Sequence, residues 1–163
     1  MPKILPPTRK PEWIRTRIPK GKGFANISST NQSLGLSTIC EEAKCPNQWE
    51  CWKEGTATFL LMGDTCTRAC RFCSVKTSKH PPDLDRDEPS KLVESIKNLK
   101  LKYAVLTSVD RDDIPDFGAK HLSDCVKVIK KHNPMLIVEL LIPDFQSSTN
   151  SIDIVADSGA EVI

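Results

Sequence analysis

Short apolar runs alternate with amphipathic segments along most of this chain, and this alternation restricts the fold more than any other feature. Strands are predicted at residues 56–62, 103–109, 136–142 and 160–163. Helices are predicted at residues 88–99, 118–132 and 148–157. An order in which each strand is followed by a helix implies parallel strands joined by right-handed crossovers.

The expected fold class is α/β, as the first half of a partial, TIM-like (β/α) barrel. The run at 136–142 is apolar on both faces, as in a parallel sheet covered by helices. We divide the chain into an N-terminal cysteine-rich extension, residues 1–51, and a core domain with an incomplete barrel, residues 52–163. A chain ending in mid-pattern suggests a fragment, and a half-barrel that dimerises is the alternative. Active sites of such barrels lie where the strands end.

Six of the seven cysteines fall in two groups between residues 40 and 73, which favours metal ligation in a reducing compartment over disulfides. The charge is nearly balanced, with 23 Lys and Arg against 21 Asp and Glu, and does not suggest a nucleic-acid binder. No apolar run reaches the roughly 18 residues of a membrane span. We therefore expect neither nucleic acid nor membrane as a partner.

Residues 1–23 form a basic arm interrupted by five prolines. Transit peptides are amphipathic helices, which these prolines prevent, and a signal peptide needs an apolar run that is absent here. The sequence thus predicts a cytoplasmic, bacterial-type location. The arm itself is either a solvated tail or a docking segment for an acidic partner protein.

The second cysteine group comprises Cys66, Cys70 and Cys73 in the spacing C-x3-C-x2-C. Three thiolates bind three irons of a [4Fe–4S] cube and leave the fourth iron open to a small molecule. A zinc site is the alternative, with His80 as a fourth ligand, although structural zinc prefers paired C-x2-C motifs. The spacing resembles the radical S-adenosylmethionine superfamily. That resemblance implies S-adenosylmethionine on the open iron and Phe72 beside its adenine.

The first cysteine group comprises Cys40, Cys45 and Cys51 in the spacing C-x4-C-x5-C. Together the two groups resemble the lipoyl synthase family. Further segments that carry this resemblance are Lys10–Pro19, Gly55–Cys73, Val105–Asp113 and Leu141–Phe145. One departure is Phe117, where the resemblance implies a glycine.

The resemblance implies two [4Fe–4S] clusters, the one at the first cysteine group being auxiliary and consumed as the sulfur source. It implies a transferase of lipoate biosynthesis that inserts two sulfur atoms at carbons C6 and C8 of a protein-bound octanoyl group. Unactivated C–H bonds are beyond acid–base catalysis, so a radical cofactor is chemically reasonable. In that family a serine near the C-terminus is the auxiliary cluster's fourth ligand. The alternatives are another radical enzyme with one auxiliary cluster, or a non-catalytic iron–sulfur or zinc module.

The partners that the resemblance implies are of three kinds. The substrates are octanoylated lipoyl carrier domains, namely the E2 subunits of 2-oxoacid dehydrogenases and the H protein of glycine cleavage. A low-potential donor such as ferredoxin or flavodoxin supplies electrons. Iron–sulfur delivery proteins load the clusters.

Five other positions carry specific expectations. Ser108 and Asp110 follow the second strand, where the superfamily binds the methionyl group, and Asp110 is a candidate partner for its ammonium; loop and capping roles are the alternative. Glu139 lies in an apolar strand, either binding a ribose hydroxyl or forming a structural ion pair. Cys125 is expected in the core and His121 on the solvated side of its helix.

Overall fold

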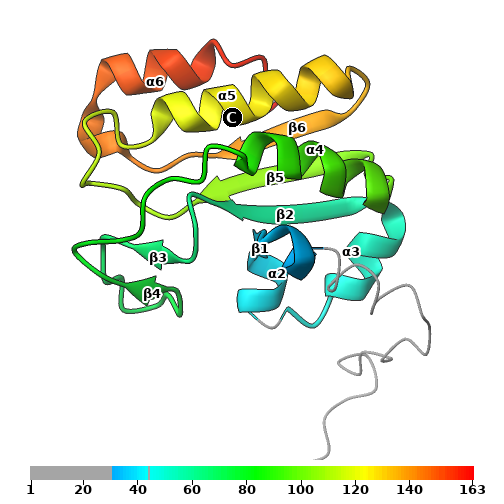
Figure 1. The fold of residues 1–163 in the computed structure, drawn as a ribbon, viewed down its shortest axis with the longest axis horizontal. Helices are drawn as coiled ribbons and strands as arrows, with labels where there is room; N and C mark the ends of the chain where they lie inside the picture. Colours follow the sequence, from blue (N-terminus) through cyan, green and yellow to red (C-terminus); the bar gives the residue numbers. More distant parts are fainter. Residues whose placement is uncertain (1–30, 44) are drawn as a thin grey trace, which may run out of the picture.

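The computed structural model describes residues 31–43 and 45–163 and shows a four-stranded sheet with helices packed on it (Figure 1). The strand order is β1-β2-β5-β6. The strands are β1 (Ser37–Thr38), β2 (Thr56–Leu61), β5 (Tyr103–Ser108) and β6 (Ile137–Leu141). β2, β5 and β6 are parallel, whereas β1 pairs antiparallel with β2. The parallel α/β architecture without a closed barrel is confirmed.

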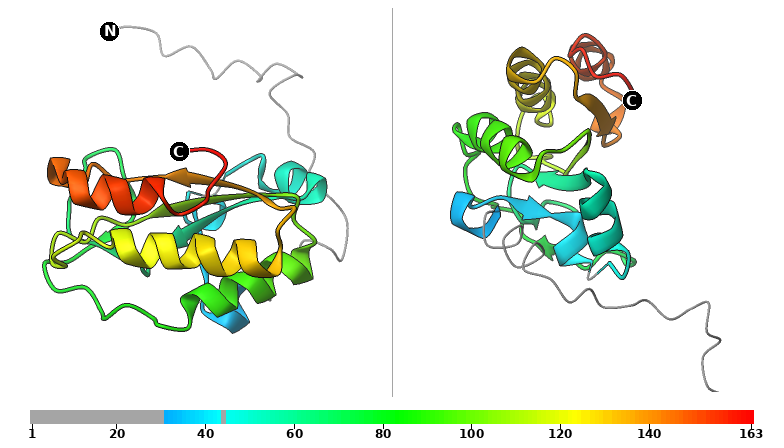
Figure 2. Two further views of the ribbon diagram at one scale, coloured as in Figure 1. Left: turned by 90° about the horizontal axis from the view of Figure 1, so that it is seen from above. Right: turned by 90° about the vertical axis from the view of Figure 1, so that its right-hand side faces the viewer.

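Three helices lie side by side over one face of the sheet (Figure 2, left). They are α4 (Glu88–Leu99), α5 (Ala119–His132) and α6 (Thr149–Ala156). Alternate side chains of the strands, such as Phe59, Leu106 and Val138, lie under these helices and are fully buried. The core therefore lies between the sheet and this helical layer, as a period of two in the strands requires.

The opposite face of the sheet is covered only in part, so the expectation of strands buried on both faces is wrong. α2 (Ile39–Glu42) and α3 (Gln48–Glu54) pack against β2, but Ile137 and Leu141 of β6 are 43% and 51% exposed. These apolar side chains belong to the face that lines the interior in a closed (β/α) barrel. The predicted strand at 160–163 is present as a single parallel bridge between Glu139 and Val162.

The loops at the carboxyl ends of the strands hold two small additional elements. β3 (Thr65–Cys66) and β4 (Lys76–Thr77) form a two-stranded parallel sheet beyond the tip of β2, and the 3-10 helix η2 (Phe145–Ser147) follows β6 (Figure 1). Gly118, which precedes α5, has φ +84° and approaches Met62 so closely that a Cβ would lie 2.2 Å from the Met62 sulfur. Phe117, for which the resemblance implies glycine, has φ 56°, in the region that glycine favours.

The proposed boundary between residues 51 and 52 falls inside α3, and β1 of the extension is part of the main sheet. The basic arm at 1–23 lies outside the described residues. In the part of the chain that the structure describes, no helix has the length and apolar character needed to cross a membrane.

Candidate active site

The loop that carries the second cysteine group leaves the end of β2 and is closed at its base by β3 and β4. Cys66 is the last residue of β3, and its carbonyl accepts a hydrogen bond from Ser78. Cys70 and Cys73 lie at the exposed tip, where the Cys73 amide donates to the Cys70 carbonyl. The three thiols therefore share one short loop at the carboxyl end of the sheet, as predicted.

Cys66 is the buried member of this group. Its sulfur accepts hydrogen bonds from the amides of Arg68 (3.4 Å) and Asp110 (3.3 Å). Its thiol donates to the Asp110 carboxylate across 3.6 Å. Burial raises the pKa of the Cys66 thiol, although the two amides oppose this effect. The loop after β5 thus fixes the position of the Cys66 sulfur.

A pocket of about 210 Å3 lies between the cysteine loop and the end of β5. Six residues proposed from the sequence line it: Cys66, Cys70, Cys73, Phe72, Ser108 and Asp110. The other lining residues, which the sequence analysis did not single out as site residues, are mainly apolar: Ile39, Leu60, Arg68, Val75, Thr107 and Val109. The structure therefore brings the predicted ligands and the predicted cofactor contacts to one place.

Ser108 gives this pocket an unsatisfied polar group. Its hydroxyl oxygen is buried and has no hydrogen-bond partner among the described residues. An unpaired buried hydroxyl costs about 1–3 kcal/mol, which a polar ligand in the pocket would offset. The wall thus suits a cofactor such as S-adenosylmethionine, which carries both apolar surface and hydrogen-bonding groups.

Phe72 and Glu139 have different surroundings. Phe72 is 94% exposed at the mouth of the pocket, so its ring is free to lie against a bound ligand. Glu139 is not among the residues that line this pocket. Its carboxylate accepts a hydrogen bond from the Tyr103 hydroxyl on the partly open face of the sheet, which raises the pKa of Tyr103.

The first cysteine group lies next to the same pocket. Cys40 is in α2, Cys51 is in α3, and the Cys45 amide donates to the Cys40 carbonyl (3.0 Å). Burial raises the pKa of Cys51, and the neighbouring Cys40 and Cys45 raise it further. Ile39, the residue before Cys40, lines the pocket of the second group. The first cysteine group therefore begins directly after a residue of this pocket.

The donor set bears on the two metal hypotheses. Structural zinc is bound by four ligands, commonly in paired C-x2-C motifs, whereas the second cysteine group offers three thiolates on one loop. Three thiolates bind three irons of a [4Fe–4S] cube and leave the fourth iron open to a ligand, and a pocket lies beside these cysteines. The residues of the second group therefore fit an iron–sulfur cube.

Arg68 forms a network that the sequence analysis missed. Its guanidinium contacts Asp112, in the loop after β5, and Asp144, in the loop after β6. These two carboxylates raise the pKa of Arg68, and the guanidinium in turn lowers the pKa of both aspartates. No local sequence signal identifies this network, because its members are 44 and 76 residues from Arg68.

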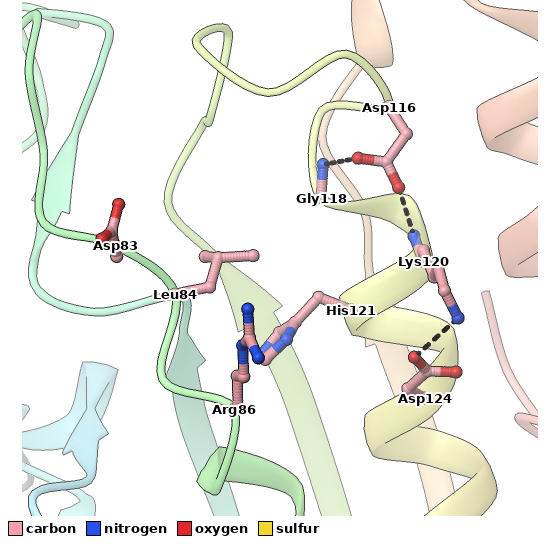
Figure 3. A pocket seen from close by; sticks show the side chains of 8 residues that line it. All are labelled: Asp83, Leu84, Arg86, Asp116, Gly118, Lys120, His121 and Asp124. Atoms are coloured by element: carbon pink, nitrogen blue, oxygen red, sulfur yellow. Dashed lines mark hydrogen bonds and ion pairs between the residues drawn. The ribbon is translucent and has the colours of Figure 1, made fainter.

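A larger cavity, of about 840 Å3, is lined by none of the six clustered cysteines and lies between the start of α5 and the loop before α4 (Figure 3). His121 lines it, and only 12% of this side chain is exposed because its ring contacts the Glu88 carboxylate (2.6 Å). The expectation that His121 is solvated is therefore wrong. Glu88, His121 and Cys125 place their ligand atoms within 4.8 Å of one another, and hydrogen bonds already account for the first two.

Cys125 is fully buried in the core, as predicted, and burial raises the pKa of its thiol strongly. In folded, metal-free protein we expect iodoacetamide to modify Cys70 at least about a hundredfold faster than Cys125, since the thiolate is the nucleophile. Mass spectrometry of timed peptide digests measures both rates. Labelling of Cys125 at the rate of Cys70 in the native protein would contradict its placement in the core.

Comparison with known families agrees with this geometry. Residues 5–45 match the N-terminal domain of lipoyl synthase of the radical SAM family, and residues 60–163 match the radical SAM superfamily. The chain is 53% identical over 159 residues to a mitochondrial lipoyl synthase of Culex quinquefasciatus, covering 94% of this chain and 42% of the relative. It is 51% identical to the human mitochondrial lipoyl synthase, covering 94% of this chain and 43% of the relative.

The chain thus spans less than half the length of these curated relatives. Their names place them in mitochondria, which contradicts the cytoplasmic location expected from the basic arm. That expectation was wrong because it treated the composition of the first 23 residues as evidence about targeting. The superfamily match implies S-adenosylmethionine and a [4Fe–4S] cluster as cofactors. The chain belongs to the radical SAM superfamily and, within it, to the lipoyl synthase family.

Proposed function

We propose that this protein acts in lipoyl synthesis, by S-adenosylmethionine-dependent insertion of two sulfur atoms at C6 and C8 of a protein-bound octanoyl group. The observation that carries the proposal is the position of Ile39, which joins the segment of Cys40, Cys45 and Cys51 to the pocket of the second cysteine group. Insertion of sulfur at an unactivated carbon needs a radical source and a sulfur source close together. The second cysteine group, which lines this pocket, is the candidate radical source, and the first cysteine group beside it is the candidate sulfur source.

Cys66, Cys70 and Cys73 are the proposed ligands of the cluster that binds S-adenosylmethionine, with Phe72, Ser108 and Asp110 as contacts to that molecule. When bound, the reduced cluster and S-adenosylmethionine supply a carbon-centred radical that removes hydrogen from the substrate. Asp110 accepts the Cys66 S–H only while the thiol is protonated. Metal binding removes that proton and leaves the Asp110 carboxylate available to a ligand ammonium group.

Cys40, Cys45 and Cys51 are the proposed ligands of a second, auxiliary [4Fe–4S] cluster. Cys40 and Cys45 both raise the pKa of Cys51, which supports a site shared by the three thiols. We also propose that residues 1–51 and 52–163 are functional regions, one for the auxiliary cluster and one for the radical cluster. Since α3 crosses this boundary, the division concerns function and not independent folding.

Glu139 is proposed to contact the nucleoside from the partly open face of the sheet, with Tyr103 holding its carboxylate. The proposed substrates are octanoylated lipoyl carrier domains, namely E2 subunits of 2-oxoacid dehydrogenases and the glycine cleavage H protein. A low-potential donor such as ferredoxin or flavodoxin and iron–sulfur delivery proteins complete the proposed partners. The relatives' names support a mitochondrial setting for them.

A segment exchange tests the proposed activity. Because the chain spans 43% of the human relative, it replaces the matching segment of that protein. We expect the chimera, given S-adenosylmethionine, a reductant and an octanoyl-lysine peptide, to release 5′-deoxyadenosine and form the lipoyl peptide, both measured by mass spectrometry. The matched control is the same chimera with Cys66→Ala, which should form neither. Release of 5′-deoxyadenosine without sulfur insertion would retain the superfamily chemistry and reject lipoyl synthesis.

A further inference from the structure

Arg68 connects three loops that follow three different strands. It lies in the cysteine loop after β2, and its guanidinium binds the Asp112 carboxylate with Nε (2.8 Å) and Nη2 (2.7 Å). On its other side it binds the Asp144 carboxylate with Nη1 (2.9 Å) and Nη2 (2.8 Å). Two forked contacts of this kind fix both the distance and the orientation of the groups that they join.

Additional hydrogen bonds hold the partners of Arg68 in place. Asp112 accepts from the Thr67 hydroxyl (3.1 Å) and from the Gln146 amide (2.9 Å). The Thr67 hydroxyl shares its one hydrogen between Asp112 and the Asp110 carbonyl (2.9 Å). Asp110 adds a third carboxylate to the network, 3.5 Å from the guanidinium. One cation therefore faces three carboxylates contributed by the loops after β5 and β6.

The position of Arg68 within the cysteine motif gives this network a chemical consequence. Arg68 lies two residues from both Cys66 and Cys70, and its own amide donates to the Cys66 sulfur (3.4 Å). Residues 69–74, which carry Cys70 and Cys73, are exposed. The guanidinium thus attaches the segment just before the exposed tip of the loop to the loops after β5 and β6.

We propose that Arg68 is a positioning residue that clamps the cysteine loop to the loops after β5 and β6 and so holds Cys66, Cys70 and Cys73 ready for the radical cluster. The inference rests on the proposed function, since it assigns this cluster to these cysteines. It adds a role for Arg68, Asp112 and Asp144, none of which touches the cluster in this assignment. The clamp also links the proposed metal site to the carboxyl end of β6 through Asp144.

The test uses Arg68→Lys, which keeps the charge but removes the planar fork. Arg71→Lys is the matched control, because Arg71 is an exposed arginine in the same loop. Each substitution is made in two single-cluster proteins. One carries alanine at Cys40, Cys45 and Cys51 and so retains only the second cysteine group. The other carries alanine at Cys66, Cys70 and Cys73.

The rate of cluster loss to a chelator is followed by visible absorbance after anaerobic reconstitution. We expect Arg68→Lys to accelerate loss from the second cysteine group about tenfold, the effect of losing one charge-assisted contact. Arg68→Lys should leave the rate of cluster loss from the first cysteine group unchanged. Arg71→Lys should change the rate of loss from neither cysteine group. Equal acceleration in both single-cluster proteins would mean a general loosening of the fold and would overturn the proposal.

A second variant and a measurement on metal-free protein distinguish failure of the Arg68 clamp from failure of the proposed function. Asp144→Asn, at a side chain that is 64% exposed, should accelerate loss in the same direction, and its combination with Arg68→Lys should add little to Arg68→Lys alone. In metal-free protein, Arg68→Lys should raise hydrogen exchange at residues 64–78 and not at 88–99. Exchange that is unchanged rejects the clamp, whereas a wild-type protein that binds no iron at Cys66 rejects the proposed function.

Discussion

On the proposed function, replacing Cys66 with alanine in the chimera with the human relative is expected to remove about four of about eight irons per chain and to abolish cleavage of S-adenosylmethionine. Cys66 is the buried ligand of the second group, and two backbone amides hold its sulfur. A cube that loses this ligand keeps only the two exposed cysteines of the loop tip. Iron analysis after anaerobic reconstitution and chromatography of 5′-deoxyadenosine measure the two losses.

Two further substitutions serve as controls for this loss. Cys40→Ala should remove the other half of the iron while cleavage of S-adenosylmethionine continues, because its cluster is auxiliary in the proposed function. Cys125→Ala should leave all of the iron in place, since Cys125 is a core residue away from both groups. A Cys66→Ala protein that retains about eight irons would show that Cys66 is not a ligand.

The fold was predictable where a local pattern determines the structure. The helix expected at 88–99 is found at Glu88–Leu99, because its apolar positions recur with the helical period and Leu92 and Ile96 are buried against the sheet. The bounds of β2, β5 and β6 differ from expectation by one residue at most, whereas the strand expected at 160–163 is reduced to one bridge. Both faces of β6 read as apolar in the sequence, yet Ile137 and Leu141 are substantially exposed, because burial depends on elements that pack from elsewhere.

The site was predictable only to the extent that its residues lie close together in the sequence. Spacing identified the six cysteines as two groups, and the family resemblance identified Ser108 and Asp110. Arg68 was missed because its partners come from the ends of other strands. His121 was misplaced because a helical wheel assigns one polar face to solvent, whereas α4 presents Glu88 to that face. Charged side chains that pair across long distances in the sequence leave no periodic pattern in that sequence.

Glu88 supports the start of the cysteine loop, at the end of β2. Glu88 is 6% exposed, and its carboxylate accepts the Met62 amide with both oxygens, at 3.2 and 3.1 Å. Its Oε2 also contacts the His121 ring at 2.6 Å, at the edge of the cavity shown in Figure 3. Met62 has φ 66°, a conformation that costs a non-glycine residue roughly 1–2 kcal/mol. Glu88 therefore stabilises a strained residue immediately before Gly63 and the cysteine loop.

We expect Glu88→Ala to lower the free energy of unfolding by about 3 kcal/mol, because it leaves the Met62 amide and the His121 ring without their buried acceptor. Glu88→Gln keeps an acceptor for Met62 and should cost about 1 kcal/mol. The matched control is Glu94→Ala, an exposed glutamate of the same helix, which should stay within about 0.5 kcal/mol of wild type. Urea denaturation of the metal-free protein measures all three.

Comparison with Arg68→Lys then separates two ways of holding the same loop. Glu88 acts on the end of β2 inside the core, so Glu88→Ala should weaken the whole fold and speed the loss of both clusters. Arg68 acts at the partly exposed mouth, so Arg68→Lys should speed the loss of one cluster with little change in unfolding. If Glu88→Ala proved no less stable than Glu94→Ala, the carboxylate would not support Met62, and the left-handed turn before the cysteines would depend on the packing of the buried Met62 side chain.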